Sequence, residues 1–248
     1  LAGIGGAGKT RLAARAAAEL AAAYPEGAVW VSLVALRHPW QVEREIARAL
    51  GLDEKIALTE GIGARPLLMV LDNCEHLRAA CAELCAALLG SCPRLRILAT
   101  SRRSLGVAGE QVVRIPPLEL PASDEAGLAV TEAEAVRLFL DRAGRGLPAF
   151  RLDAGSAPSV ARLCRRLGGI PLALELAAAR VRTLGLAPVA ARLEEDPGML
   201  ADREGRQAAH QRTLDGTIAW STALLTEAEA ALWRRLAIFR GGWTLEAA

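Results

Sequence analysis

Short apolar runs alternate with helix-forming stretches through the first half of the chain. Val29–Leu33 is rich in β-branched and aromatic residues, which predicts a strand. Leu67–Leu71 is continuously apolar, as expected of a strand covered on both faces of a parallel sheet, and Leu95–Ala99 predicts another buried strand. Before Gly51, apolar positions recur at helical spacing, whereas the stretch from Gly51 to Leu67 shows little pattern and predicts a loop. The alternation predicts an α/β domain built on a parallel sheet.

The pattern changes after a proline-containing segment. Residues 111–115, QVVRI, predict a last strand, and the prolines that follow predict a linker. From Ser123 onward, helical periodicity dominates. Thr131 and Glu134 have the spacing of a capping box, so we expect Thr131 to be the N-cap of one helix. Another helix is expected to begin at Pro171, since the first turn tolerates the missing proline N–H.

Composition excludes some classes of protein. With 52% hydrophobic residues among 248, the chain can bury a core, and its net charge of +2 is too near balance to indicate nucleic acid or a membrane surface as a partner. No apolar run reaches the roughly 18–20 residues of a membrane span, and no signal peptide is recognised. These features predict a cytoplasmic protein with no membrane partner.

The five cysteines are odd in number and lack the spacing of a secreted disulfide framework, which predicts reduced thiols. Cys81 and Cys85 share one helix face, and Cys74 and His76 precede them. A zinc site is therefore an alternative to buried, apolar thiols.

The most specific motif is Gly3–Thr10, GIGGAGKT, which has the spacing of a phosphate-binding loop. Its glycines, Gly3, Gly5, Gly6 and Gly8, are expected to adopt positive φ and bring backbone N–H groups close to an anion. Lys9 is placed to reach the β- and γ-phosphates, and Thr10 to ligate Mg²⁺ at the start of an Ala-rich helix. The alternative is a glycine-rich turn that merely precedes a helix.

A phosphate-binding loop follows a strand, yet only two residues precede Gly3 and the chain does not begin with Met. We therefore expect most of the first strand to be missing from this sequence, and the sequence to be a piece of a longer protein.

Asp72 ends the second predicted strand, where phosphate-loop proteins place a carboxylate that holds Mg²⁺. The alternative is an Asp that caps the following helix. Asn73 comes next, and an amide cannot accept a proton from an attacking water, which indicates slow hydrolysis. Glu75 could take that role only if the backbone turns it inward.

Arg102 follows the third predicted strand, and the strand ends of a doubly wound sheet meet at the ligand crevice. A guanidinium there could bind a γ-phosphate and so distinguish triphosphate from diphosphate. The alternative is an ordinary surface arginine.

Four segments, GIGGAGKT, LLMVLDN, ILATSRR and GGIPLALELAA, resemble in this order the signal-transduction ATPases with numerous domains (STAND) of the NB-ARC or AP-ATPase type. The nearest likeness is to bacterial transcriptional regulators of the LuxR-like and SARP type, and it covers nearly the whole chain. The resemblance implies a P-loop NTPase parallel sheet of order 2-3-4-1-5 with its first strand mostly missing. An all-α helical domain and the start of a winged-helix domain would follow. We expect these three domains to occupy residues 1–122, 123–207 and 208–248.

The family's functional residues map onto this sequence by motif. The resemblance implies catalytic roles for Lys9, Asp72 and Arg102, Mg²⁺ ligation by Thr10 and Asp72, and a Pro171 that packs beside adenine. The predicted nucleotide-binding set is Gly3, Gly5, Gly6, Ala7, Gly8, Lys9, Thr10, Arg11, Arg102 and Pro171. Two departures stand out. Asn73 replaces the second acid of the metal-binding strand, and the family's Met-His-Asp signature is missing because the sequence ends before its expected position; His210 does not match it.

The leading hypothesis is an ATP/ADP switch with at most slow ATPase activity. Expected partners are nucleotide, output and sensor domains of the same longer chain, and a homo-oligomer that forms with nucleotide; DNA would be reached only through other domains. One alternative is a turnover ATPase or kinase. Another is direct DNA binding by the segment that contains Trp233, Arg234 and Arg235.

Overall fold

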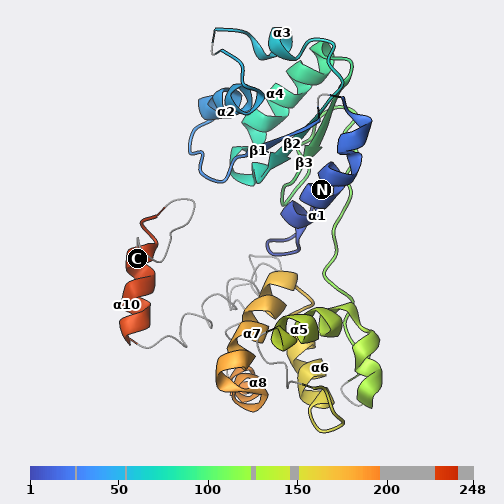
Figure 1. The fold of residues 1–248 in the computed structure, drawn as a ribbon, viewed down its shortest axis with the longest axis vertical. Coiled ribbons are helices and arrows are strands. Elements are labelled where there is room, and N and C mark those ends of the chain that lie inside the picture. Colours follow the sequence, from blue (N-terminus) through green and yellow to red (C-terminus); the bar gives the residue numbers. More distant parts are fainter. Residues whose placement is uncertain (26, 54, 124–126, 146–150, 196–226, 240–248) are drawn as a thin grey trace. The chain divides into compact units, whose positions relative to one another are not determined.

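The computed structural model describes residues 1–25, 27–53, 55–123, 127–145, 151–195 and 227–239. The chain divides into two compact units (Figure 1). The first, here called the sheet unit, comprises Leu1–Gly3 and Gly8–Ile115. The second, the helical unit, comprises Ile4–Ala7 and the residues from Pro116 onward. The glycine-rich loop thus contributes residues to both units.

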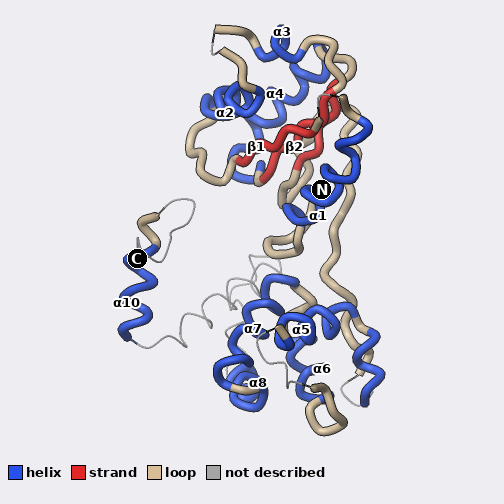
Figure 2. Tube along the Cα trace, in the orientation of Figure 1, coloured by secondary structure: helices blue, strands red, loops and turns tan. Residues whose placement is uncertain are grey.

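A three-stranded parallel sheet forms the centre of the sheet unit (Figure 2). Strand β1 (Ala28–Ser32) pairs with β2 (Leu67–Asp72), and β2 pairs with β3 (Leu95–Ala99), in the order β1-β2-β3. All six residues of β2 are buried, because helices cover both faces of the sheet. The predicted parallel α/β arrangement is confirmed for these three strands.

Four α-helices and two 3-10 helices surround this sheet: α1 (Lys9–Leu20), η1 (Ala21–Ala23), α2 (Trp40–Leu50), α3 (Leu58–Ile62), η2 (Cys74–Leu77) and α4 (Arg78–Ser91). Successive residues of β2 point to opposite faces. Leu68 and Val70 pack against Ala13 and Ala17 of α1, whereas Met69 belongs to the larger core formed with α2, α3 and α4. The sheet unit therefore has three layers, with α1 on one face and three helices on the other. The short helix α3 lies where the sequence predicted a loop.

The last predicted strand, residues 111–115, is reduced to a single bridge in the structure. Arg114 bridges Ala2 in parallel, and Ala2 also bridges Ser101 on its other side. Only two backbone hydrogen bonds join this segment to Ala2, and the two prolines that follow cannot donate further ones. The prediction of a full strand here is wrong. The five-strand order stays a prediction.

The described part of the helical unit consists of η3 (Gly127–Glu132), α5 (Glu134–Gly144), α6 (Ala157–Arg166), α7 (Pro171–Leu184), α8 (Leu186–Glu195) and α10 (Glu227–Leu236). One apolar core joins α5, α6, α7 and α8, and Phe139 is its largest fully buried side chain. Small residues such as Ala173 and Ala177 of α7 are fully buried in this core. The predicted helical character of the second part is confirmed for these residues.

The predicted capping box at Thr131 is wrong. Helix α5 begins after Ala133, which makes no side-chain cap, and Thr131 lies within the preceding 3-10 helix. The Glu134 carboxylate instead accepts a hydrogen bond from the Glu119 N–H at 3.2 Å. By contrast, α7 begins at Pro171 as predicted.

Several sequence predictions fall outside the described residues. They are the linker at 196–207, His210, and most of the third predicted domain at 208–248. Of that domain the structure describes residues 227–239, in which Trp233, Arg234 and Arg235 are exposed on α10.

Candidate functional site

The glycine-rich loop uses its glycines for two different reasons. Gly6 and Gly8 have φ of 75° and 89°, in the left-handed region that favours glycine. Gly3 and Gly5 do not have positive φ, so that part of the prediction is wrong. Gly3 is required by close approach instead, because a Cβ there would lie 2.8 Å from the carbonyl oxygen of Ile115.

Helix α1 starts at Lys9, directly after the loop. Gly8 is its N-cap residue, and the Gly8 carbonyl accepts a hydrogen bond from the Leu12 N–H at 2.9 Å. The first turn of a helix combines outward-directed N–H groups with the positive end of the helix dipole. Thr10 and Arg11 are exposed in this turn, and Ala7 is buried just before it. The local structure therefore has the features of an anion-binding helix start.

Lys9 is nearly buried and folds back onto its own loop. Its residue is 9% exposed, and Nζ donates a hydrogen bond to the Gly3 carbonyl at 2.9 Å. Burial lowers the pKa of Lys9, Glu75 raises it, and the positive charge of Arg102 lowers it further. The ammonium group thus lies within electrostatic reach of both side chains. A phosphate brought to it would supply the negative charge that burial makes favourable.

Asp72 joins the loop motif to the end of β2. Its Oδ1 accepts hydrogen bonds from the Thr10 hydroxyl at 2.8 Å and from the Thr100 hydroxyl at 2.7 Å. The carboxylate is 5% exposed, so these bonds offset the cost of its burial. The N-cap positions of η2 and α4 are Asn73 and Leu77, so Asp72 is not the helix cap that the alternative interpretation required.

The donor set fits the requirements of Mg²⁺. This ion prefers oxygen ligands and is commonly held by one or two protein groups together with phosphates. The Thr10 hydroxyl and the Asp72 carboxylate are such oxygens, and they already lie 2.8 Å apart. These two residues could hold the ion, and a bound Mg²⁺ would neutralise phosphate charge there.

Asn73 makes a sharp turn after β2. Its φ is 68°, which makes it the one non-glycine residue with positive φ in the described part of the chain. Its N–H donates to the Thr100 hydroxyl at 2.9 Å. Its side-chain nitrogen lies 3.3 Å from Nδ1 of His76, and Nε2 of His76 lies 3.1 Å from the Leu36 carbonyl oxygen. Because a carbonyl only accepts, His76 carries its proton on Nε2, and its Nδ1 accepts from the Asn73 amide. The amide therefore has a structural partner.

Arg102 forms an ion pair with Glu75 that the sequence analysis did not predict. Its Nε lies 3.3 Å from Oε1 of Glu75, in an ion pair in which Arg102 is 45% and Glu75 22% exposed. The second carboxylate oxygen, Oε2, is buried and has no hydrogen-bond partner among the residues that the structure describes. The turn at Asn73 has thus brought Glu75 inward, toward Arg102 and Lys9.

Pro171 and the middle of the loop belong to the helical unit. The N–H of Leu172, the second residue of α7, donates to the Gly6 carbonyl at 3.2 Å. Ile4 packs against the apolar core of the same unit. Pro171 is half-buried at the start of α7.

The zinc alternative finds no support. All five cysteines are free and buried, and no group of three or more His, Cys, Asp or Glu able to hold a metal occurs among the described residues. Both His76 nitrogens have other partners. Burial raises the pKa of Cys85 and Cys164 to about 12, which keeps these thiols protonated and unreactive.

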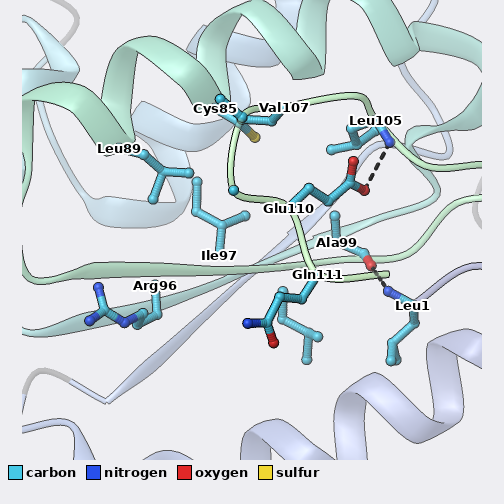
Figure 3. Close-up of a pocket in the computed structure, with 13 residues that line it drawn as sticks. Leu1, Cys85, Leu89, Arg96, Ile97, Ala99, Leu105, Val107, Glu110 and Gln111 are labelled. Atoms are coloured by element: carbon cyan, nitrogen blue, oxygen red, sulfur yellow. Dashed lines mark hydrogen bonds between the residues drawn. The ribbon is translucent and has the colours of Figure 1, made fainter. Parts of the chain in front are cut away.

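A cavity of about 480 Å³ lies elsewhere in the sheet unit (Figure 3). It is bounded by α4, by the edge of β3 that faces away from β2, and by the segment 105–111. Two of its polar groups have partners: the Glu110 carboxylate accepts hydrogen bonds from the Leu105 and Gly106 N–H groups, and the Leu1 ammonium donates one to the Ala99 carbonyl. None of the predicted site residues lines it.

The sequence analysis assigned no role to Thr100. In the structure, Leu71 of β2 is opposite Ala99 of β3, which places the next residues, Asp72 and Thr100, side by side. The signal was available in principle, since polar residues directly after adjacent parallel strands meet at one edge.

No family model matches the chain, but comparison with known proteins finds relatives. The chain is 45% identical over its whole length to "Putative HTH-type transcriptional regulator Rv0890c" of Mycobacterium tuberculosis, of which it covers 27%. It is 39% identical over its whole length to the uncharacterized protein Rv0894 of the same organism, of which it covers 62%. It is also 30% identical to the regulatory protein AfsR of Streptomyces coelicolor, over 87% of this chain and 21% of that protein.

The chain therefore spans about a quarter of the first of these relatives. Two of these relatives, Rv0890c and AfsR, carry the names of regulators, and the name of Rv0890c specifies a transcriptional regulator. In the part of the chain that the structure describes, no helix is both long and apolar enough to cross a membrane.

Proposed function

We propose that this chain is the nucleotide-switch region of a bacterial transcriptional regulator of the STAND class. It would bind ATP or ADP with Mg²⁺ and pass the identity of the nucleotide to output domains outside these residues. The observation that carries the proposal is the 2.8 Å hydrogen bond from Thr10 to Asp72, which joins the loop motif to the metal-binding strand motif 62 residues later.

Each residue of the site has a proposed part. Lys9 binds the β- and γ-phosphates, the helix start at Thr10 and Arg11 adds backbone donors, and Thr10 and Asp72 hold Mg²⁺. Thr100 orients the Asp72 carboxylate through its 2.7 Å hydrogen bond. Arg102 binds the γ-phosphate.

The loop glycines and α7 complete the proposed nucleotide site. Gly6 and Gly8 provide the left-handed turns that aim the backbone at phosphate. Pro171 packs beside the adenine ring, as the family resemblance implies. The hydrogen bond from the Leu172 N–H, next to Pro171, to the Gly6 carbonyl of the loop supports this placement.

We also propose the P-loop sheet order 2-3-4-1-5. The observed order β1-β2-β3 corresponds to its first three positions, and Ala2 bridges Ser101 on one side and Arg114 on the other, as the fourth and fifth positions require.

A switch needs states that differ in their affinity for the two nucleotides, because a ligand with equal affinity for both states shifts nothing. Arg102 supplies such a difference, since only ATP has a γ-phosphate. Asn73 favours slow hydrolysis, because its amide cannot act as a base and already bonds His76. The relatives' names support a role in regulation. The proposal implies a cytoplasmic protein that reaches DNA through other domains, and oligomers that form with nucleotide.

Calorimetric titration of ATP and ADP, each with Mg²⁺, into the unmodified chain and into Lys9→Ala tests the proposal. We expect the substitution to lower the affinity for both nucleotides by at least about 100-fold, since charge-assisted hydrogen bonds contribute about 1.5–3 kcal/mol each.

Arg15→Ala is the control. Arg15 is an exposed residue of the same helix, and the bond that the structure shows for its side chain is the ion pair with exposed Glu19. Equal affinities of unmodified chain and Lys9→Ala would contradict the proposal. Steady turnover above roughly 1 s⁻¹ would favour a turnover ATPase or kinase instead.

A further inference from the structure

Glu75 and Arg102 follow the ends of two neighbouring strands, β2 and β3. Each lies three residues beyond the end of its strand, Glu75 after β2 and Arg102 after β3. The left-handed turn at Asn73 and the 3-10 helix η2 bend the chain so that the Glu75 carboxylate reaches Arg102 at 3.3 Å. The ion pair is therefore formed at the edge of the sheet where the loop lysine also lies.

The pair is close enough to act on the phosphate-binding lysine. Among the charges that affect Lys9, Glu75 has the largest influence, ahead of Arg102 and Asp72. A carboxylate at this place repels phosphate, and it also holds the guanidinium that a γ-phosphate would need. Arg102 lies 3.3 Å from the first carboxylate oxygen of Glu75, whereas the second oxygen has no hydrogen-bond partner among the described residues.

We propose that Glu75 sets the preference between ATP and ADP by competing with the γ-phosphate for Arg102. The inference rests on the proposed nucleotide site. Arg102 stays with Glu75 when the loop holds ADP, and it moves to the γ-phosphate when the loop holds ATP. Breaking the Glu75 pair opposes ATP binding alone, so Glu75 makes the switch less sensitive to ATP than the loop by itself would be.

The test is calorimetry of ATP and ADP binding, with Mg²⁺, to the 248-residue chain and to Glu75→Gln. The amide keeps the shape of the side chain but removes the charge. We expect the ratio of ATP to ADP affinity to rise about two- to fivefold, the range expected for a partly exposed ion pair. Both nucleotides should also bind somewhat more tightly, because a repelling charge is gone.

The matched control is Glu45→Gln. Glu45 pairs with Arg48 on α2, at an i, i+3 spacing, and its substitution changes the net charge by the same amount. We expect it to leave the ratio of affinities unchanged. A circular dichroism spectrum and a thermal melt establish that both variants are folded.

The decisive arm repeats Glu75→Gln in a chain that already carries Arg102→Ala. With Arg102 absent there is nothing to compete for, so the second substitution should no longer change the ratio. A ratio that rises equally with and without Arg102 would overturn the competition. So would a Glu75→Gln chain that loses hydrolysis and keeps its ratio, since that result assigns Glu75 to the attacking water.

These outcomes are distinct from a failure of the proposed function. If Lys9→Ala binds nucleotide as well as the unmodified chain, the site itself is wrong. If Lys9→Ala loses binding and Glu75→Gln leaves the ratio unchanged, the nucleotide site stands and the role of Glu75 is wrong.

Discussion

The two units bury different kinds of residue. Among the described residues, the buried polar or charged ones are Lys9, Asp72, Thr100 and Ser101, and all four belong to the sheet unit. They cluster at the loop and at the strand ends. The described core of the helical unit is apolar throughout, centred on Phe139 of α5.

The buried polar residues of the sheet unit indicate that this unit holds the functional site. A buried polar group destabilises a fold unless it is bonded, so a group retained at such a place needs partners. Lys9 bonds the Gly3 carbonyl, and a separate chain of hydrogen bonds joins Thr10 to Asp72, Asp72 to Thr100, and Thr100 to the Asn73 N–H. The described core of the helical unit consists of buried apolar residues instead.

The largest expected effect separates the two units. Phe139→Ala empties the centre of the helical core and should destabilise that unit by about 3–5 kcal/mol. Hydrogen exchange read by mass spectrometry should show lost protection in α5 and α7, with β2 unchanged. Phe239→Ala is the control, because Phe239 is 42% exposed and its removal should cost under about 0.5 kcal/mol. Equal loss of protection in β2 and α7 would show that the two units unfold together.

A smaller effect is expected from the polar cluster of the sheet unit. Thr100→Val keeps the shape of the side chain but removes the hydroxyl that donates to Asp72 and accepts from the Asn73 N–H. Because it leaves the buried Asp72 carboxylate and the half-buried Asn73 N–H without this partner, it should lower stability by about 1–3 kcal/mol. Denaturant unfolding measures the loss, and Thr59→Val on α3 is the half-buried control. A stability equal to that of the control would mean that water replaces the hydroxyl at no cost.

Much of the sheet unit could be predicted from sequence because its signals are local. Continuously apolar Leu67–Leu71 predicted a strand buried on both faces, and Gly8-Lys9-Thr10 predicted a helix start. The hydrogen bonds of Thr100 could not be predicted, since they depend on the register between β2 and β3, which long-range packing decides.

Other errors have the same origin in distant partners. Helix α5 begins only at Glu134, after Thr131, and the Glu134 carboxylate bonds the backbone of Glu119, fifteen residues earlier. The inward position of Glu75 depends on the left-handed conformation of Asn73. Asparagine tolerates this conformation, but an asparagine in the sequence does not by itself predict it. The roles of Lys9, Asp72 and Arg102 stay predictions until nucleotide binding is measured.

The smallest of these three effects is also the most direct test of the central claim, that this site distinguishes ATP from ADP. The measurement is calorimetry of both nucleotides, with Mg²⁺, on the unmodified chain and on Arg102→Ala. Because Arg102 is 45% exposed, we expect ATP affinity to fall about five- to tenfold, near the lower end for a charged hydrogen bond, with ADP affinity changed less than about twofold. Equal loss of ATP and ADP affinity, or no loss of either, would contradict the claim that Arg102 reads the γ-phosphate.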